Sequence, residues 1–194
     1  LADRTLRASS NKKVENTRNW LPISLPPLFN INTMPKLSKI AVIALAATVL
    51  HAQEAEVAEI ELKPHASNPL GYDKTDLAVK VGQKIKLTLN NTGSIVPQPH
   101  NFLLLRKGKM PDNKDVIDAV GAQANLMMGD PQGMAKHYIP EASKADILAH
   151  TKLVQANGSD TIEFTAPAEE GDYAYICTFP GHWLLMRGVM HVTK

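Results

Sequence analysis

Cysteine is almost absent from this chain: Cys177 is the one cysteine among its 194 residues. A lone cysteine excludes an internal disulfide, so no covalent cross-link stabilises the fold. An unpaired thiol is also a liability in an oxidising compartment. The side chain could be a small buried apolar group, or it could be protected because it binds a metal ion.

Long apolar runs are also missing. The apolar run over residues 40–50 is far shorter than the roughly 20 residues that cross a bilayer as a helix. It follows a basic start at residues 34–39 and ends just before Ala52, which is the pattern of a secretory signal peptide. We therefore expect residues 34–52 to be a signal peptide that is cut after Ala52, and the mature form to have no membrane span. No cysteine lies near this cut, which argues against a lipid anchor.

The segment before this signal lacks apolar periodicity. Residues 1–33 carry several basic side chains and precede Met34, which opens a well-formed signal by itself. We expect translation to start at Met34 and residues 1–33 to be an upstream extension or a disordered segment. The folded domain is then expected over residues 53–194, which is enough for one hydrophobic core.

This domain has no surplus of positive charge. The whole chain has 21 Lys and Arg, 19 Asp and Glu, and a formal net charge of +2. Seven of the basic and two of the acidic residues precede Gln53, so 14 basic and 17 acidic residues remain and the domain carries −3. A slightly acidic domain gives no electrostatic support for binding nucleic acid.

The domain does contain many short segments in which apolar and polar residues alternate, the period of a half-buried strand. Strands are expected over residues 57–63, 77–81, 84–90, 100–105, 147–154, 161–165, 173–177 and 189–192. Apolar residues between 113 and 128 fall near helical spacing instead, so a helix is expected there, ending near Gly129. The pattern predicts an all-β fold, an antiparallel Greek-key β-sandwich with one helical insertion.

The segment that carries the most chemistry is residues 175–186, Tyr-Ile-Cys-Thr-Phe-Pro-Gly-His-Trp-Leu-Leu-Met. Four residues separate Cys177 from His182, and three separate His182 from Met186. A thiolate, an imidazole and a thioether are three of the four side chains of a blue-copper centre, and a second imidazole completes the set. Such a centre moves one electron at a time.

The second imidazole must come from elsewhere in the fold. His100 is the best candidate, because it starts an apolar segment well upstream of Cys177 and two strands could therefore converge on one ion. His51 lies in the signal segment. The remaining histidines are expected to be surface or packed residues: His65, His137, His150 and His191.

With these residues the domain resembles azurin, a member of the cupredoxin family of blue copper proteins. Residues 177–182, followed by Met-Arg-Gly at 186–188, are similar to the azurin ligand loop, and residues 150–153 match an azurin strand segment. The resemblance implies a cupredoxin-like fold, copper (Cu(I)/Cu(II)) as cofactor and no enzymatic activity. It implies four copper ligands: His100, Cys177, His182 and Met186.

The resemblance also implies roles for the neighbours of these ligands. Asn101 would brace the cysteine loop, with Thr178 and Pro99 beside the ligands, although Asn101 could also be an ordinary turn residue. The sequence departs from azurin at Pro99, where azurins have a glycine, and at Trp183, where they have a smaller side chain. The disulfide of azurins is absent.

Apolar residues should surround the place where the His182 ring reaches the surface. They are Trp183, Leu184 and Leu185, together with Pro99, and such a patch would serve brief contacts with redox partners. Two of these leucines could instead be core residues. Three methionines could suggest copper handling, but we expect them to make core or interface contacts: Met127, Met128 and Met134.

The sequence thus predicts a periplasmic one-electron carrier with a type 1 mononuclear copper centre. Its expected partners are transient redox proteins, such as cytochromes or periplasmic reductases. Copper enzymes need further centres, often built from His-x-His pairs, and the chain has no such pair. The alternatives are a copper chaperone or storage protein, or an accessory subunit of a copper enzyme. Zinc could occupy the same ligands as a structural ion.

Overall fold

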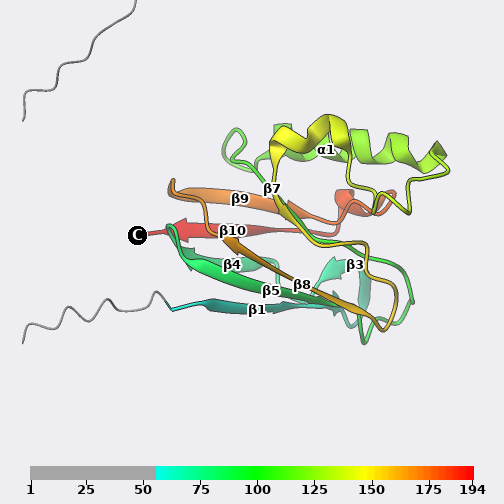
Figure 1. Cartoon of the computed structure of the whole chain (residues 1–194), viewed down its shortest axis with the longest axis horizontal. Coiled ribbons are helices and arrows are strands. Elements are labelled where there is room, and N and C mark those ends of the chain that lie inside the picture. Colours follow the sequence, from blue (N-terminus) through cyan, green and yellow to red (C-terminus); the bar gives the residue numbers. More distant parts are fainter. Residues whose placement is uncertain (1–55) are drawn as a thin grey trace, which may run out of the picture. The chain divides into compact units, whose positions relative to one another are not determined.

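The computed structural model describes residues 56–194 (Figure 1). The predictions of an upstream extension at residues 1–33 and of a signal peptide at 34–52 lie outside the described residues. The strands are β1 Ala58–Leu62, β2 Pro64–His65, β3 Asn68–Tyr72, β4 Asp76–Lys80, β5 Lys84–Asn90, β6 Leu103–Leu105, β7 Ile147–His150, β8 Ser159–Thr165, β9 Gly171–Ile176 and β10 Arg187–Thr193. The helix α1 spans Lys114–Leu126, and three 3₁₀ turns are η3 Met127–Gly129, η4 Glu141–Asp146 and η5 His182–Leu184.

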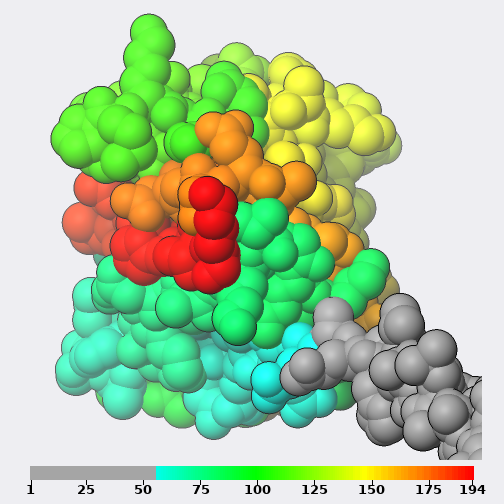
Figure 2. Space-filling view, turned by 90° about the vertical axis from the view of Figure 1, so that its left-hand side faces the viewer, coloured from blue at the N-terminus to red at the C-terminus, as the bar shows by residue number. Residues whose placement is uncertain are grey.

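The strands form two main sheets that face each other. One has the order β1-β5-β8, the other has the order β4-β10-β9-β6-β7, and β2 pairs with β3. Figure 1 shows these layers with α1 outside the sheet that contains β9. Figure 2 views the end of the domain where the chain terminates, with the red residues of β10 between neighbouring segments of the same sheet. The predicted all-β sandwich with one helical insertion is confirmed.

The expectation that the sandwich is antiparallel throughout is wrong. β1 runs parallel to β5, and β10 runs parallel to β4. Alternation of apolar and polar residues reports that one face of a strand is buried, and this alternation is the same for either strand direction. The direction of each strand depends on the connections, which carry no such periodicity.

The main core lies between the two sheets. Along β5 the buried side chains are Ile85, Leu87 and Leu89, every second residue, as a half-buried strand requires. They belong to one cluster that also contains buried residues of the opposite sheet: Leu77, Val79, Tyr173, Tyr175, Met190 and Val192. Each fully buried Leu or Ile contributes roughly 1.5–3 kcal/mol relative to an exposed one.

A second cluster lies outside the five-stranded sheet, under α1. The helix buries Val116, Ile117 and Val120, which share one face because Val120 lies four residues after Val116 and three after Ile117. These side chains pack on alternate residues of two strands: Leu103 and Leu105 of β6 and Ala174 and Ile176 of β9. The strands β6 and β9 therefore contribute to both clusters, with one face to each.

Some element boundaries and burial states differ from expectation. The segment expected as a strand over 100–105 is regular only in β6, and His100 instead forms an isolated bridge with Val154. Core or interface contacts were expected for Met128 and Met134; they are 64% and 53% exposed, so the core alternative is wrong for both. Leu126 is 72% exposed because it lies at the last turn of α1, beyond the sheet-facing cluster. Within residues 56–194, no helix combines the length and apolar character needed to cross a membrane.

Candidate metal centre

The predicted ligands come from two places that the sheet brings together. Cys177 follows β9 directly, His182 begins η5, and Met186 precedes β10, so all three lie on the loop between two paired strands. Strand β6 pairs antiparallel with β9 through Leu103 and Ile176. In that register the residues before Leu103 lie beside those after Ile176, which places His100 next to the loop.

Three donor atoms converge at this point. Cys177 Sγ lies 3.9 Å from His100 Nδ1 and 3.7 Å from His182 Nδ1. The ligand atoms of the three residues all lie within 4.8 Å of one another, and all three residues are buried. Metal–nitrogen bonds of about 2.0 Å and metal–sulfur bonds of about 2.3 Å in a trigonal plane separate sulfur from nitrogen by about 3.7 Å. Both sulfur–nitrogen distances therefore fit a metal ion held by these three residues.

Met186 lies beside this group and is fully buried, in the same cluster as Cys177. Its backbone closes the loop, because Met186 O accepts from the Cys177 N–H over 2.9 Å and Met186 N–H donates to His182 O over 2.8 Å. These hydrogen bonds hold the Met186 backbone next to Cys177 and His182.

Burial sets the protonation of the three donors. It lowers the pKa of His100 to about 4, with a smaller contribution from the neighbouring His182, and it lowers the pKa of His182 to about 4. Both imidazoles are therefore neutral near pH 7 and keep a lone pair for a metal. Burial raises the pKa of the Cys177 thiol to about 12, so a cation is needed to stabilise the thiolate here.

Asn101 connects the histidine segment with the cysteine loop. Its Oδ1 accepts from the Thr178 N–H over 2.7 Å, and its Nδ2 donates to Thr178 Oγ1 over 2.8 Å. The same Nδ2 lies 2.8 Å from His137 O, and Asn101 O accepts from the Tyr72 hydroxyl over 2.6 Å. Asn101 and Thr178 are fully buried, so the two hydrogen bonds between them have no competition from water.

The residues of the predicted apolar patch lie in different environments. Leu184 and Leu185 are 53% and 64% exposed, and Pro99 is half-buried. Trp183 is also half-buried, and it packs against the cluster under α1. His182 retains 5% exposure whereas His100 has none, so His182 is the imidazole that approaches the surface.

Two aromatic residues near His182 are not predicted from the sequence: one contacts the His182 ring, and the other contacts the first. The Phe179 ring lies 4.8 Å from the His182 ring at 67°, and Tyr138 lies edge-on to Phe179 at 5.6 Å. Phe179 could have been found because it lies between two predicted ligands. Tyr138 has no such signal, since it comes from the segment between α1 and η4.

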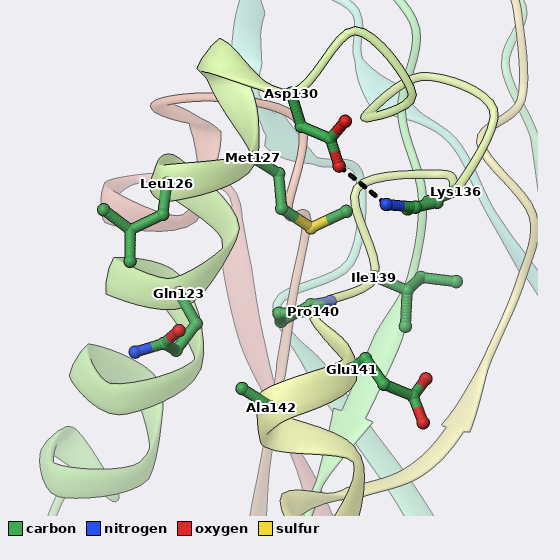
Figure 3. A pocket seen from close by; sticks show the side chains of 9 residues that line it. All are labelled: Gln123, Leu126, Met127, Asp130, Lys136, Ile139, Pro140, Glu141 and Ala142. Atoms are coloured by element: carbon green, nitrogen blue, oxygen red, sulfur yellow. Dashed lines mark hydrogen bonds and ion pairs between the residues drawn. The ribbon is translucent and has the colours of Figure 1, made fainter.

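A surface pocket lies away from these residues. An open pocket of about 640 Å³ lies between the end of α1 and residues 130–142 (Figure 3). Met127 points into it, and an ion pair of Asp130 with Lys136 lies at its edge. None of the predicted site residues lines this pocket.

Comparison with known proteins agrees with this geometry. Residues 58–193 match the family model of copper binding proteins, plastocyanin/azurin family. The chain is 38% identical over 125 residues to Auracyanin-A of Chloroflexus aurantiacus. The aligned residues cover 63% of this chain and 67% of that protein. It is 30% identical over 148 residues to Auracyanin-B of the same organism, covering 76% of this chain and 56% of that protein. It therefore spans little more than half of Auracyanin-B.

Solved structures give the same result. The chain is similar to the crystal structure of reduced auracyanin from Roseiflexus castenholzii, with 36% identity and a TM-score of 0.57 over 71% of this chain and 98% of that one. It is also similar to auracyanin A of Chloroflexus aurantiacus, described as a "blue" copper protein, with 35% identity and a TM-score of 0.59 over 71% of this chain and 100% of that one.

Proposed function

Because the chain belongs to the plastocyanin/azurin family of copper-binding proteins, we propose that it is a periplasmic one-electron carrier. Its type 1 copper centre would be held by His100, Cys177, His182 and Met186. The observation that carries this proposal is the convergence of two neutral imidazoles on one buried thiol, with both sulfur–nitrogen distances close to those of a trigonal site. Bound copper would supply a one-electron couple between its cuprous and cupric states.

The protein's own residues keep this site rigid and dry. His100, Cys177 and Met186 are fully buried, so water does not reach the donor atoms from their side. Asn101 ties Thr178, the residue after Cys177, to the segment that carries His100. A donor set held in this way changes little between the two oxidation states, which favours fast electron exchange.

Electrons would enter and leave at His182, whose ring approaches the surface beside Leu184 and Leu185. Two exposed leucines next to a ligand suit short-lived contacts with another redox protein. We propose cytochromes or periplasmic reductases as such partners. The periplasmic location rests on the signal pattern of residues 34–52, with the mature domain over 53–194.

Burial of the donors disfavours a copper chaperone or storage protein. Proteins of that kind exchange metal through open ligand sets, whereas His100 and Cys177 have no exposed surface. An accessory role in a copper enzyme would require a second centre. Among residues 56–194, His100, Cys177 and His182 form the one group of three or more His, Cys, Asp or Glu side chains with metal-binding geometry.

An absorption spectrum of the copper-loaded protein tests the proposal. We expect an intense visible thiolate-to-copper band that bleaches on reduction and returns on oxidation. Cys177→Ser should abolish the band, because the band needs the soft sulfur donor. Copper binding without such a band, or a band that survives in Cys177→Ser, would contradict the proposal, and tight binding of zinc alone would indicate a structural ion.

A further inference from the structure

One helix holds the residues on both sides of His182. Before it, the Gly181 N–H donates to Asn125 Oδ1 over 3.2 Å. After it, the indole of Trp183 lies against Gly121, one turn earlier on α1. A Cβ atom added to Gly121 would lie 2.2 Å from Trp183 Cδ2 and 2.5 Å from Cε3, much closer than real Cβ contacts. Only glycine leaves room for the ring at this position.

Gly121 destabilises helix α1, and the packing of the Trp183 ring explains why a glycine lies there. A glycine inside a helix destabilises it by roughly 1 kcal/mol relative to alanine. Gly121 is buried in the middle of α1, and the Trp183 ring occupies the space that a side chain would take. Trp183 thereby joins the cluster formed by α1 with the outer face of the five-stranded sheet.

The other backbone hydrogen bonds of the turn stay inside it. His182 N–H donates to Phe179 O over 2.9 Å, and His182 O accepts from the N–H groups of Leu185 and Met186. These bonds shape the turn but do not attach it to the helix. The attachment to α1 runs through Gly181 on one side of His182 and through Trp183 on the other.

We propose that Trp183, whose ring packs against Gly121, is a positioning residue that fixes the orientation of the His182 ring. Helix α1 thereby holds one side of the metal centre in place. This inference rests on the proposed function in one respect, that His182 is a ligand. It assigns to Trp183 a packing role and leaves contact with partners to Leu184 and Leu185, which are exposed.

Copper release to a chelator, the visible band and the reduction potential of the full chain test this proposal. Trp183→Ala removes the ring that packs against Gly121, and Gly121→Val displaces the ring from this position. Both should speed copper release by about 10–100-fold and shift the band and potential, as loss of a residue that orients a ligand does. Ala122→Val is the matched control, because Ala122 is the exposed neighbour on the same helix. It should behave as wild type.

Tryptophan fluorescence of the copper-free protein tests the packing of Trp183 against Gly121 separately from metal binding. The chain has two tryptophans, Trp20 and Trp183, so a Trp20→Phe background reports Trp183 alone. Gly121→Val should shift the fluorescence of the copper-free protein to the red, because the indole moves into water. An unshifted emission with Gly121→Val would overturn the proposal.

A double variant tests whether both changes act through one contact. In Trp183→Ala, the further change Gly121→Ala should leave copper release unaltered, although Gly121→Ala alone speeds it. Independent, additive effects would overturn the proposal, as would wild-type release and potential in Trp183→Ala. If Trp183→Ala does not fold, Trp183→Phe should release copper at an intermediate rate, and a wild-type rate there would also overturn it. Failure of the proposed function would be seen earlier, as a missing visible band in the wild-type protein.

Discussion

Asn101 joins the two segments of the centre through side-chain hydrogen bonds. Its side chain is hydrogen-bonded to the backbone N–H and to the hydroxyl of Thr178, and both residues are fully buried. A buried donor that loses its only partner costs about 1–3 kcal/mol, because it has already lost its hydrogen bonds to water. The amide of Asn101 therefore stabilises the fold as well as the geometry of the cysteine loop.

Asn101→Ala should lower the free energy of unfolding by about 1–3 kcal/mol, since it leaves the Thr178 N–H unpartnered. Denaturant unfolding of the full chain measures this loss. Thr178→Val is the control, because it removes the hydroxyl and keeps the backbone bond to Asn101 Oδ1. A loss in Thr178→Val as large as in Asn101→Ala would show that the backbone bond contributes nothing.

Met186 permits a separate test at the same scale. Met186→Leu conserves volume in the core, which typically costs less than about 1.5 kcal/mol, and it removes the thioether donor. We expect copper to stay bound and the reduction potential to rise, because the thioether would tune the potential as a weak fourth donor while the other three donors remain. Voltammetry measures this shift, and an unchanged potential would place the sulfur out of reach of the metal.

The loop between β9 and β10 determines which residues around the metal centre are buried and which are exposed. Cys177 and Met186 at its ends belong to the core between the sheets, while Trp183 in its middle packs under α1. Gly181 allows the turn, since its φ of 82° lies in the left-handed region that favours glycine. The turn therefore exposes Leu184 and Leu185 beside His182 without exposing the donors.

Leu184→Glu should slow electron self-exchange by about tenfold, which corresponds to about 1.4 kcal/mol, because two like charges must approach and lose water. NMR line broadening at fixed ionic strength measures the rate. Leu148→Glu is the matched control: Leu148 is 47% exposed, compared with 53% for Leu184, and lies on the edge strand β7. Equal rates in the two variants would place the electron port elsewhere, and a lost visible band in Leu184→Glu would indicate a packing role.

Across the whole domain, His191 links three strands of one sheet. From β10 its Nδ1 lies 2.7 Å from Asp172 of β9 and its Nε2 lies 3.2 Å from Asp76 of β4. The hydrogen bond with Asp172, and after it that with Asp76, raises the pKa of His191 above its ordinary 6.5. The Thr75 hydroxyl and then His191 lower the pKa of Asp76 below its ordinary 3.8.

Stability should therefore depend on pH through His191. Its pKa is raised in the folded protein, so its contribution is complete below 6.5 and is lost as pH rises through the raised value. The contribution of Asp76 is present above 3.8 and is lost as pH falls. The link is strongest between these limits, and it is modest because the side chains are substantially exposed.

His191→Gln should lower the free energy of unfolding at about pH 5.5 and have much less effect at about pH 9, where the wild-type imidazole is neutral. Urea unfolding at low salt measures both values. The same loss at both pH values would show that His191 acts through packing. High salt should reduce the difference at the lower pH, since exposed charges are screened.

The sequence alone determined the features that depend on neighbouring residues. Periodicity located the helix between residues 113 and 128 and most strands of the sandwich, because burial of one face imposes it locally. The spacing of Cys177, His182 and Met186 indicated a soft metal site, since one short loop carries all three. His100 was selected by its position before an apolar segment.

Only the tertiary structure decided which distant groups meet. The register of β6 and β9 brings His100 beside Cys177, 77 residues later, and two strand pairs run parallel although their alternation does not reveal it. Nothing in the sequence indicated that the Trp183 ring packs against Gly121. Such contacts join elements far apart in the chain, and they depend on packing shape, which leaves no periodic pattern in the sequence.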